Sequence, residues 1–212
     1  MTLAELLSQA RIRLGDTGVD LLWPNAQLSA WANEAHMEAC RRLRYLSDDS
    51  VTQSLVAGQS AYAWPEGAIF IRRARLTEED RPLQFTSYKA LDEFCPGWED
   101  HSGTPTHIFT DLNNTTFNLY PSPDAAGVLK MLIIKEPEPL TGDTDLPSRL
   151  AYGLVDWICG RAYQVNDADT FNPQKSAEHF ALFDAEYGPR SSARDEVFNL
   201  RNRPFDNFDG DY

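Results

Sequence analysis

Four histidines and three cysteines are the side chains of this sequence that could supply a nucleophile, a general base or a soft metal ligand. His36 and Cys40 are four residues apart, a spacing that places both on one face of a helix. Protein zinc sites use three or four side chains, so two ligands do not make a site. We therefore expect His36 and Cys40 to be a half-exposed helical pair, and we predict no metal.

Cys95, His101 and His107 surround loops that contain Gly and Pro, with Asp100 and Asp111 nearby. A cysteine paired with a histidine can form a catalytic nucleophile, so an enzyme built on these residues is one hypothesis. Nothing in the sequence marks an activated thiolate or an oxyanion hole. The GxGxxG, GxxxxGK[ST], HExxH and GxSxG motifs are also missing. We therefore predict that the protein is not an enzyme and uses no cofactor.

The remaining clusters of reactive side chains point to no site either. The three cysteines are odd in number and far apart, and no CxxC pair exists, so neither a disulfide framework nor a zinc knuckle is expected. The acidic clusters at 78–80 and 99–100 lack the DxDxDG pattern of a calcium loop. We interpret them as solvated turns.

The charge of the chain restricts its partners. The formal net charge is −13, with an isoelectric point near 4.6. Residues 1–46 carry five acids and five bases, whereas residues 136–187 carry ten acids and three bases. Sites that bind nucleic-acid backbones concentrate Lys and Arg, so direct binding to DNA is not expected. The excess acid suits an ordinary solvated face, which is the preferred explanation, or a passage in which DNA must not stick.

Two amphipathic helices are predicted at the start of the chain. Apolar residues recur at helical spacing in 3–14 and again in 25–46. A short loop joins them, so an antiparallel helical hairpin is the natural expectation. The first segment has Glu5 among its leucines and no basic start, so it is not a signal peptide. No apolar run approaches the roughly 20 residues that a membrane helix needs, and no membrane partner is predicted.

The middle of the chain has the pattern of short strands. Residues 51–65 alternate polar and apolar side chains around Gly58 and Gln59, which predicts a β-hairpin. Further strands are predicted at 68–76, 107–110, 115–120 and 128–134, and one short helix at 87–94. Two helices follow, at 148–165 and, after a cap at Asn172, up to residue 187.

The order of helices, strands and helices predicts an α+β fold. The N- and C-terminal helices would form an antiparallel helical bundle, with a small antiparallel β-sheet or sandwich inserted between them and an extended C-terminal tail. We divide the chain into an N-terminal helical hairpin (1–49), a β-rich insertion (50–146), C-terminal helices completing the bundle (147–187) and a docking tail (188–212).

The tail has few apolar residues, yet its aromatic side chains are spaced throughout. A segment that cannot bury itself but carries regular aromatics is suited to docking on a partner. A frayed terminus explains the composition equally well.

An ordered set of motifs resembles the head–tail adaptor (connector) proteins of tailed phages. Each motif is common by itself, and their order over about residues 1–187 carries the resemblance. The motifs are 23–28 (WPNAQL), 32–35 (ANEA), 56–65 (VAGQSAYAWP), 103–108 (GTPTHI), 119–124 (LYPSPD) and the strand and Pro-containing loop of 133–147.

The resemblance implies a structural protein of the virion neck that is present in the host cytoplasm during assembly. Its partners would be further copies in a ring, commonly of twelve, the portal protein, and tail or nozzle proteins. Genomic DNA would pass through the channel without sequence-specific binding. In that family C-terminal segments often reach into the portal. We therefore predict a portal-docking set in the tail: Phe198, Leu200, Arg201, Arg203, Phe205, Phe208 and Tyr212.

An alternative from another class is a ligand- or carbohydrate-binding β-module of a virion or tail component. It would use the Trp and Tyr side chains of the β-rich region, of which Trp64 and Trp98 lie at a strand end and in a loop. A well-formed aromatic cleft on a monomeric protein would favour it.

Overall fold

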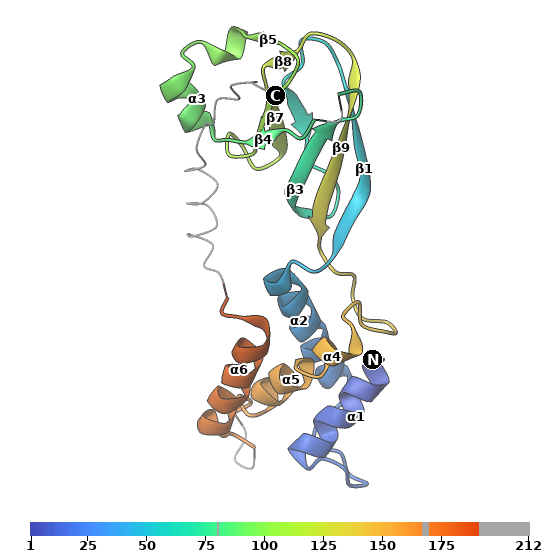
Figure 1. Ribbon diagram of the computed structural model, residues 1–212. Helices are drawn as coiled ribbons and strands as arrows, with labels where there is room; N and C mark the ends of the chain where they lie inside the picture. The colour runs from blue at the N-terminus through green and yellow to red at the C-terminus, as the bar shows by residue number, and fades with distance from the viewer. Residues whose placement is uncertain (80, 167–169, 191–212) are drawn as a thin grey trace. The chain divides into compact units, whose positions relative to one another are not determined.

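The chain folds into two compact units. The computed structural model describes residues 1–79, 81–166 and 170–190. A helical unit consists of Met1–Leu46 and Glu136–Arg190, and a β-rich unit contains Ser47–Lys135 (Figure 1). Within residues 1–190 the chain leaves the helical unit once and returns to it once. The predicted α+β class is confirmed, whereas the predicted tail beyond residue 190 lies outside the described residues.

The helical unit is built from α1 (Leu3–Leu14), α2 (Asn25–Leu43), α4 (Ser148–Ala151), α5 (Leu154–Ala162) and α6 (Pro173–Tyr187). Local signals define several ends. Thr2 and Glu5 form a reciprocal capping box at the start of α1, and the Asn172 side chain caps α6 by accepting from the Lys175 amide. The cap predicted at Asn172 is therefore confirmed.

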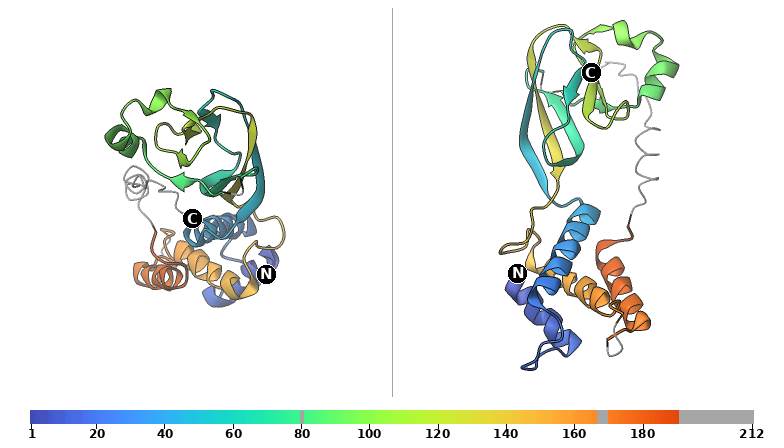
Figure 2. Two further views of the ribbon diagram at one scale, coloured as in Figure 1. Left: turned by 45° about the horizontal axis from the view of Figure 1, so that its top comes forward. Right: turned by 180° about the vertical axis from the view of Figure 1, so that it is seen from behind.

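Helix α5 is the centre of the helical unit. It lies between α6 on one side and α1 and α2 on the other (Figures 1 and 2). Its Leu154, Ile158 and Cys159 are fully buried in one apolar cluster with Leu28 of α2 and Phe183 of α6. The N- and C-terminal helices thus share a single core. Their arrangement as an antiparallel bundle stays a prediction.

The single helix predicted over 148–165 is wrong, because it is interrupted at Gly153. The Tyr187 hydroxyl donates to the Leu150 carbonyl and also contacts the Leu154 amide. Those two backbone groups would bond each other in a continuous helix, so the hydroxyl is inserted into the helical ladder. A Cβ on Gly153 would lie 2.8 Å from the same hydroxyl, so only glycine gives the tyrosine room.

The β-rich unit contains two main sheets. The first has the order β1 (Ser47–Leu55), β9 (Gly127–Lys135), β3 (Ala68–Leu76), all antiparallel. The second has the order β2, β7, β6, β4, in which β4 pairs in parallel with β6. The bounds of the remaining elements are β2 Ala61–Ala63, β4 Gln84–Phe85, α3 Tyr88–Phe94, η1 Trp98–Asp100, β5 Ser102–Gly103, β6 His107–Phe109, β7 Thr116–Tyr120 and β8 Ser122–Pro123.

The strands predicted at 107–110 and 115–120 are confirmed as β6 and β7, which pair antiparallel, and the helix at α3 is confirmed, but the hairpin predicted over 51–65 is wrong. The turn exists: Gly58 has a φ of 78°, and the Tyr62 hydroxyl donates to the Gln59 carbonyl at 2.8 Å. However, β1 pairs with β9 and β2 pairs with β7. Leu55 and Tyr62 are both buried in the core between the sheets, so the chain crosses from one sheet to the other at this turn.

The β-rich unit has three layers. The two sheets enclose one core that includes Ile108 and Leu119. Their sequence neighbours Phe109 and Tyr120 belong to a second cluster, with Trp98 and Leu91. Since neighbouring strand residues face opposite sides of a sheet, α3 and η1 cover the face of the second sheet that is turned away from the first sheet (Figure 1).

Replacing Phe183 with alanine is expected to lower the free energy of unfolding of the helical unit by about 3–5 kcal/mol, because the ring is fully buried and its removal leaves a cavity. Its centroid lies 4.4 Å from that of Tyr187 and 4.8 Å from that of Trp157. Urea unfolding followed by helical circular dichroism measures the change. Leu182→Ala is the matched control, since Leu182 is 56% exposed. Equal effects of the two changes would contradict this packing.

Candidate functional site and interaction surfaces

The seven predicted docking residues, Phe198 to Tyr212, lie outside the described residues, but the root of the tail is described. Arg42 of α2 holds that root. Its guanidinium donates to Glu38 at 2.9 Å, to Asp184 at 2.5 Å and to the Gly188 carbonyl at 2.5 Å. It also lies 5.0 Å from the centre of the Phe183 ring. The chain therefore leaves the end of α6 at a position set by a nearly buried arginine.

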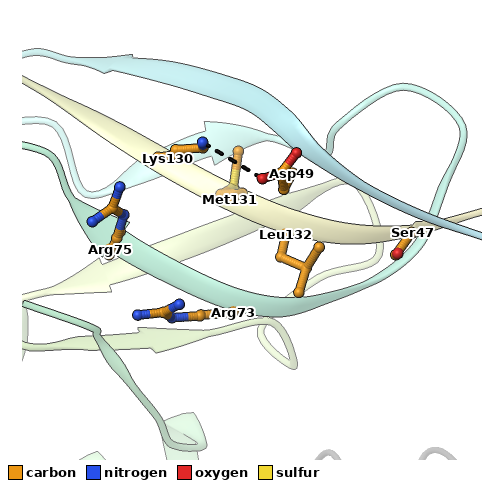
Figure 3. A pocket seen from close by; sticks show the side chains of 7 residues that line it. All are labelled: Ser47, Asp49, Arg73, Arg75, Lys130, Met131 and Leu132. Atoms are coloured by element: carbon orange, nitrogen blue, oxygen red, sulfur yellow. Dashed lines mark ion pairs between the residues drawn. The ribbon is translucent and has the colours of Figure 1, made fainter.

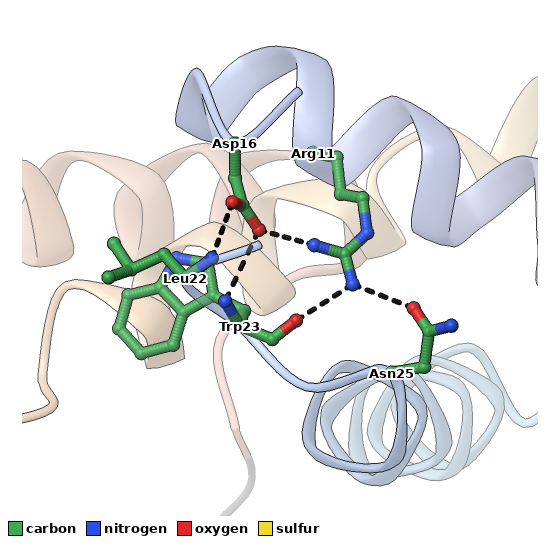
Figure 4. Close-up of polar contacts among 5 residues, drawn as sticks. All are labelled: Arg11, Asp16, Leu22, Trp23 and Asn25. Atoms are coloured by element: carbon green, nitrogen blue, oxygen red, sulfur yellow. Dashed lines mark hydrogen bonds and ion pairs between the residues drawn. The ribbon is translucent and has the colours of Figure 1, made fainter. Parts of the chain in front are cut away.

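A second arginine shapes the loop between α1 and α2 (Figure 4). Arg11 forms an ion pair with Asp16 and donates to the Trp23 carbonyl at 2.8 Å and to the Asn25 side chain at 2.6 Å. Asp16 also accepts from the Leu22 amide at 2.8 Å. The Asp16 side chain is only 4% exposed, so its charge is compensated by these donors rather than by water.

The loop held by this clamp exposes apolar side chains. Val19 is 100% exposed, Leu22 55% and Leu21 49%, and Ile12 on α1 is exposed nearby. Single exposed apolar residues are ordinary, but a fixed loop that exposes three of them in four residues is typical of a surface that a partner covers. The sequence analysis missed this loop, although the run Val-Asp-Leu-Leu at 19–22 was the available signal.

His36 and Cys40 are buried rather than half exposed, which corrects the sequence-based expectation. The His36 Nε2 atom accepts from the Asp145 amide at 3.4 Å, and the Asp145 carboxylate lies 3.3 Å away. Burial lowers the pKa of His36, and it raises the pKa of the Cys40 thiol to about 12. The pair therefore consists of a neutral imidazole and an unreactive thiol inside the helical core.

Cys95, His101 and His107 do gather, around the ring of Tyr120. The His101 Nδ1 atom lies 2.9 Å from the Tyr120 hydroxyl, and the His107 ring centroid lies 6.0 Å from that of Tyr120. Burial, aided by the neighbouring Cys95 thiol, raises the pKa of Tyr120 to about 12. The histidine thus bonds a neutral phenol and not the thiol, which does not match a nucleophile activated by a base.

A metal site and a membrane-spanning helix each need particular side chains. Within residues 1–79, 81–166 and 170–190, no three His, Cys, Asp or Glu side chains are placed to share an ion. In the same ranges, no helix is both long and apolar enough to cross a membrane.

The tryptophans proposed for ligand binding are engaged in packing. The Trp98 ring meets Phe109 edge-on at 5.3 Å, and the Trp64 indole donates to the Ala68 carbonyl at 2.8 Å. Beside Trp64 is a hollow of about 250 Å³ that Asn113 and Asn114 also line. This volume is below the range of about 300–1,000 Å³ that is usual for small-molecule sites. Trp64 is the one tryptophan that lines the hollow.

A hollow of about 480 Å³ lies on the outer face of the first sheet, and its charged lining consists of three bases and one acid (Figure 3). Arg73 and Arg75 come from β3 and Lys130 from β9, and Lys130 lies 3.7 Å from Asp49 of β1. Leu132 adds an apolar wall. The sequence analysis also missed this face, because Arg73, Arg75 and Lys130 come together only once β3 pairs with β9.

Comparison with known proteins covers nearly the whole chain. A family model described as SU10 adaptor protein matches residues 1–204. No curated protein matches the chain. The match extends beyond residues 1–187, over which the motifs carry the resemblance. It also includes four residues of the predicted docking set: Phe198, Leu200, Arg201 and Arg203.

Arg11→Ala is expected to destabilise the helical unit by about 3–5 kcal/mol, because it leaves the buried Asp16 carboxylate without its cation. Proteolysis within 16–23 should accelerate as the loop loses its clamp. The control is Arg149→Ala on α4 of the same unit. Arg149 is exposed, so its loss should cost about 0.5 kcal/mol or less. If both variants unfold alike, the clamp does not hold the loop.

The stability of the helical unit should fall as pH decreases below about 6.5, the ordinary pKa of histidine. Since burial lowers the pKa of folded His36, the unfolded chain binds a proton in this window while the folded chain does not. His36→Asn should flatten this part of the curve, as measured by urea unfolding at a series of pH values. An unchanged slope in the variant would show that other groups cause the pH dependence.

Proposed function

Because the chain belongs to the SU10 adaptor protein family of phage head–tail adaptors, we propose that it forms a ring below the portal that joins the capsid to the tail. Membership makes the protein a structural component of the phage virion that contacts other virion components. The match over residues 1–204 is the observation that carries this proposal.

A ring requires two different surfaces on each subunit that fit each other, since every copy contacts one neighbour on each side. The apolar loop tip of Val19, Leu21 and Leu22 supplies one such surface on the helical unit, because its burial against a partner removes apolar area from water. The proposed ring is a dodecamer, assembled in the host cytoplasm and retained in the neck of the virion.

The ring surrounds the channel through which genomic DNA passes. A chain with a net charge of −13 repels the phosphate backbone, so DNA slides past without sequence-specific binding. The fully buried Cys159, whose pKa burial raises to about 12, and the buried Cys40 agree with a structural role rather than an enzymatic one.

The tail binds the portal, and the β-rich unit contacts tail or nozzle proteins. Support for the first contact comes from the composition of 188–212 and from its root, because Arg42 and Glu38 hold Gly188 and Arg190 against α2. In this arrangement Phe198, Leu200, Phe205, Phe208 and Tyr212 are the anchors. Arg201 and Arg203 provide charge beside them. We keep as a proposal the division of the chain into a helical hairpin (1–49), a β-rich insertion (50–146), C-terminal helices (147–187) and a docking tail (188–212).

A chain that ends at Arg190 should fold normally and lose more than about 30-fold in affinity for the portal, the effect of removing even one strong anchor. It keeps the contacts of Arg42 and Arg190 with the helical unit. Co-sedimentation with portal rings measures binding, and negative-stain microscopy shows whether the full chain makes a ring beneath them.

A finer pair of variants separates docking from simple shortening. Phe205→Ala combined with Phe208→Ala should weaken binding, whereas Asn207→Ala between them should not. If the chain ending at Arg190 still binds the portal like the full chain, the docking role of the tail is wrong. If the full chain adds no density below the portal, the proposed ring itself is wrong.

A further inference from the structure

The first sheet of the β-rich unit concentrates the positive charge of an acidic protein. Five of the seven bases in Ser47–Lys135 lie on β3 and β9, and neither strand carries an acid. The only acids on the sheet are Asp48 and Asp49 at the start of β1. Arg73, Arg75 and Lys130 line the outer hollow together (Figure 3). The five bases are Arg72, Arg73, Arg75, Lys130 and Lys135.

The opposite side of the same unit is acidic. The layer of α3 and η1 exposes Asp92, Glu93, Glu99 and Asp100, with Lys89 as its single base. Its geometry is fixed, since the Trp98 indole donates to Asp92 at 2.8 Å and the Trp98 ring packs on Phe109. The second sheet lies between this layer and the basic sheet. One compact unit therefore carries opposite charges on opposite sides.

We propose that the β-rich units of neighbouring copies dock head to tail, with the basic sheet face of one copy against the acidic α3–η1 face of the next. This inference rests on the proposed ring and identifies one of its subunit interfaces. The two faces are different and complementary, which is what a heterologous contact that closes into a ring needs. Facing like charges would disfavour a two-fold dimer through either face.

A second copy fits the basic face better than DNA does. Asp49 lies 3.7 Å from Lys130 and Asp48 3.4 Å from Lys135, so the face carries charges of both signs, with the bases in excess. The hollow also has an apolar wall at Leu132, and Val128 on the same strand is exposed. Mixed charge with apolar contact is typical of a protein interface. Every copy carries the acidic α3–η1 face, so a complementary surface is present wherever the copies assemble.

Two charge-reversed chains test the pairing. The first combines Arg73→Glu with Lys130→Glu and so has two acidic faces. The second combines Glu93→Lys with Glu99→Lys and so has two basic faces. Each chain alone, mixed with portal rings, should show at least a tenfold drop in the fraction assembled, as measured by light scattering and negative-stain microscopy. An equimolar mixture of the two should recover rings of alternating copies, because unlike faces then meet.

Lys89→Glu is the matched control. It shifts the net charge in the same direction as Arg73→Glu, but on the face that is already acidic, so it should not reduce assembly. Assembly of the unaltered chain should also weaken in 1 M salt, where the screening length is about 3 Å.

The outcomes separate this interface from the proposed function. If the unaltered chain forms rings and both reversed chains do so equally well, the head-to-tail pairing is wrong while the ring stands. If the mixture fails to recover although both chains keep the unfolding temperature of the unaltered chain, the pairing is also wrong. If the first chain loses only the ability to shift a DNA duplex in a gel and still forms rings, the basic face serves nucleic acid instead. If the unaltered chain forms no ring, the proposed function itself fails.

Discussion

Burial of α5 between helices from both ends of the chain is the constraint on which the helical unit depends. Leu154 and Ile158 complete a core with Leu28, which precedes the β-rich unit in the sequence, and with Phe183, which follows α5. Apolar burial of this kind is the main force that holds such a unit together. Because the core needs both ends, the intervening β-rich unit begins and ends where the chain leaves and re-enters the helices.

Two arginines connect this helical unit to two segments at its surface, the root of the tail and the loop between α1 and α2. Arg42 reaches from α2 to Gly188 and fixes the root of the tail, while Arg11 reaches from α1 to Asp16 and fixes an apolar loop. A buried guanidinium costs desolvation energy, and its several hydrogen bonds offset that cost. A rigid base for each of these segments is consistent with a protein whose work is contact with partners.

Part of the fold and family was readable from local signals. The capping box at Thr2 and the cap at Asn172 define helix starts through bonds made within a few residues. The motif order also resembled the family that the chain belongs to. Local signals could not predict the break in the helix expected over 148–165, because the hydroxyl of the distant Tyr187 takes the place of a backbone hydrogen bond there. No local pattern records such an intrusion.

What the sequence by itself determined is therefore the class of fold, the starts of some helices, the acidic charge and the lack of known catalytic motifs, since these depend on composition or short spacing. The tertiary structure alone decided which strands pair, that His36 is buried, and that Arg73 and Lys130 share one face. Strand hydrogen bonds are satisfied by distant partners, so pairing depends on which face of each strand the core between the two sheets buries. A charged surface made from two strands exists only after that pairing is fixed.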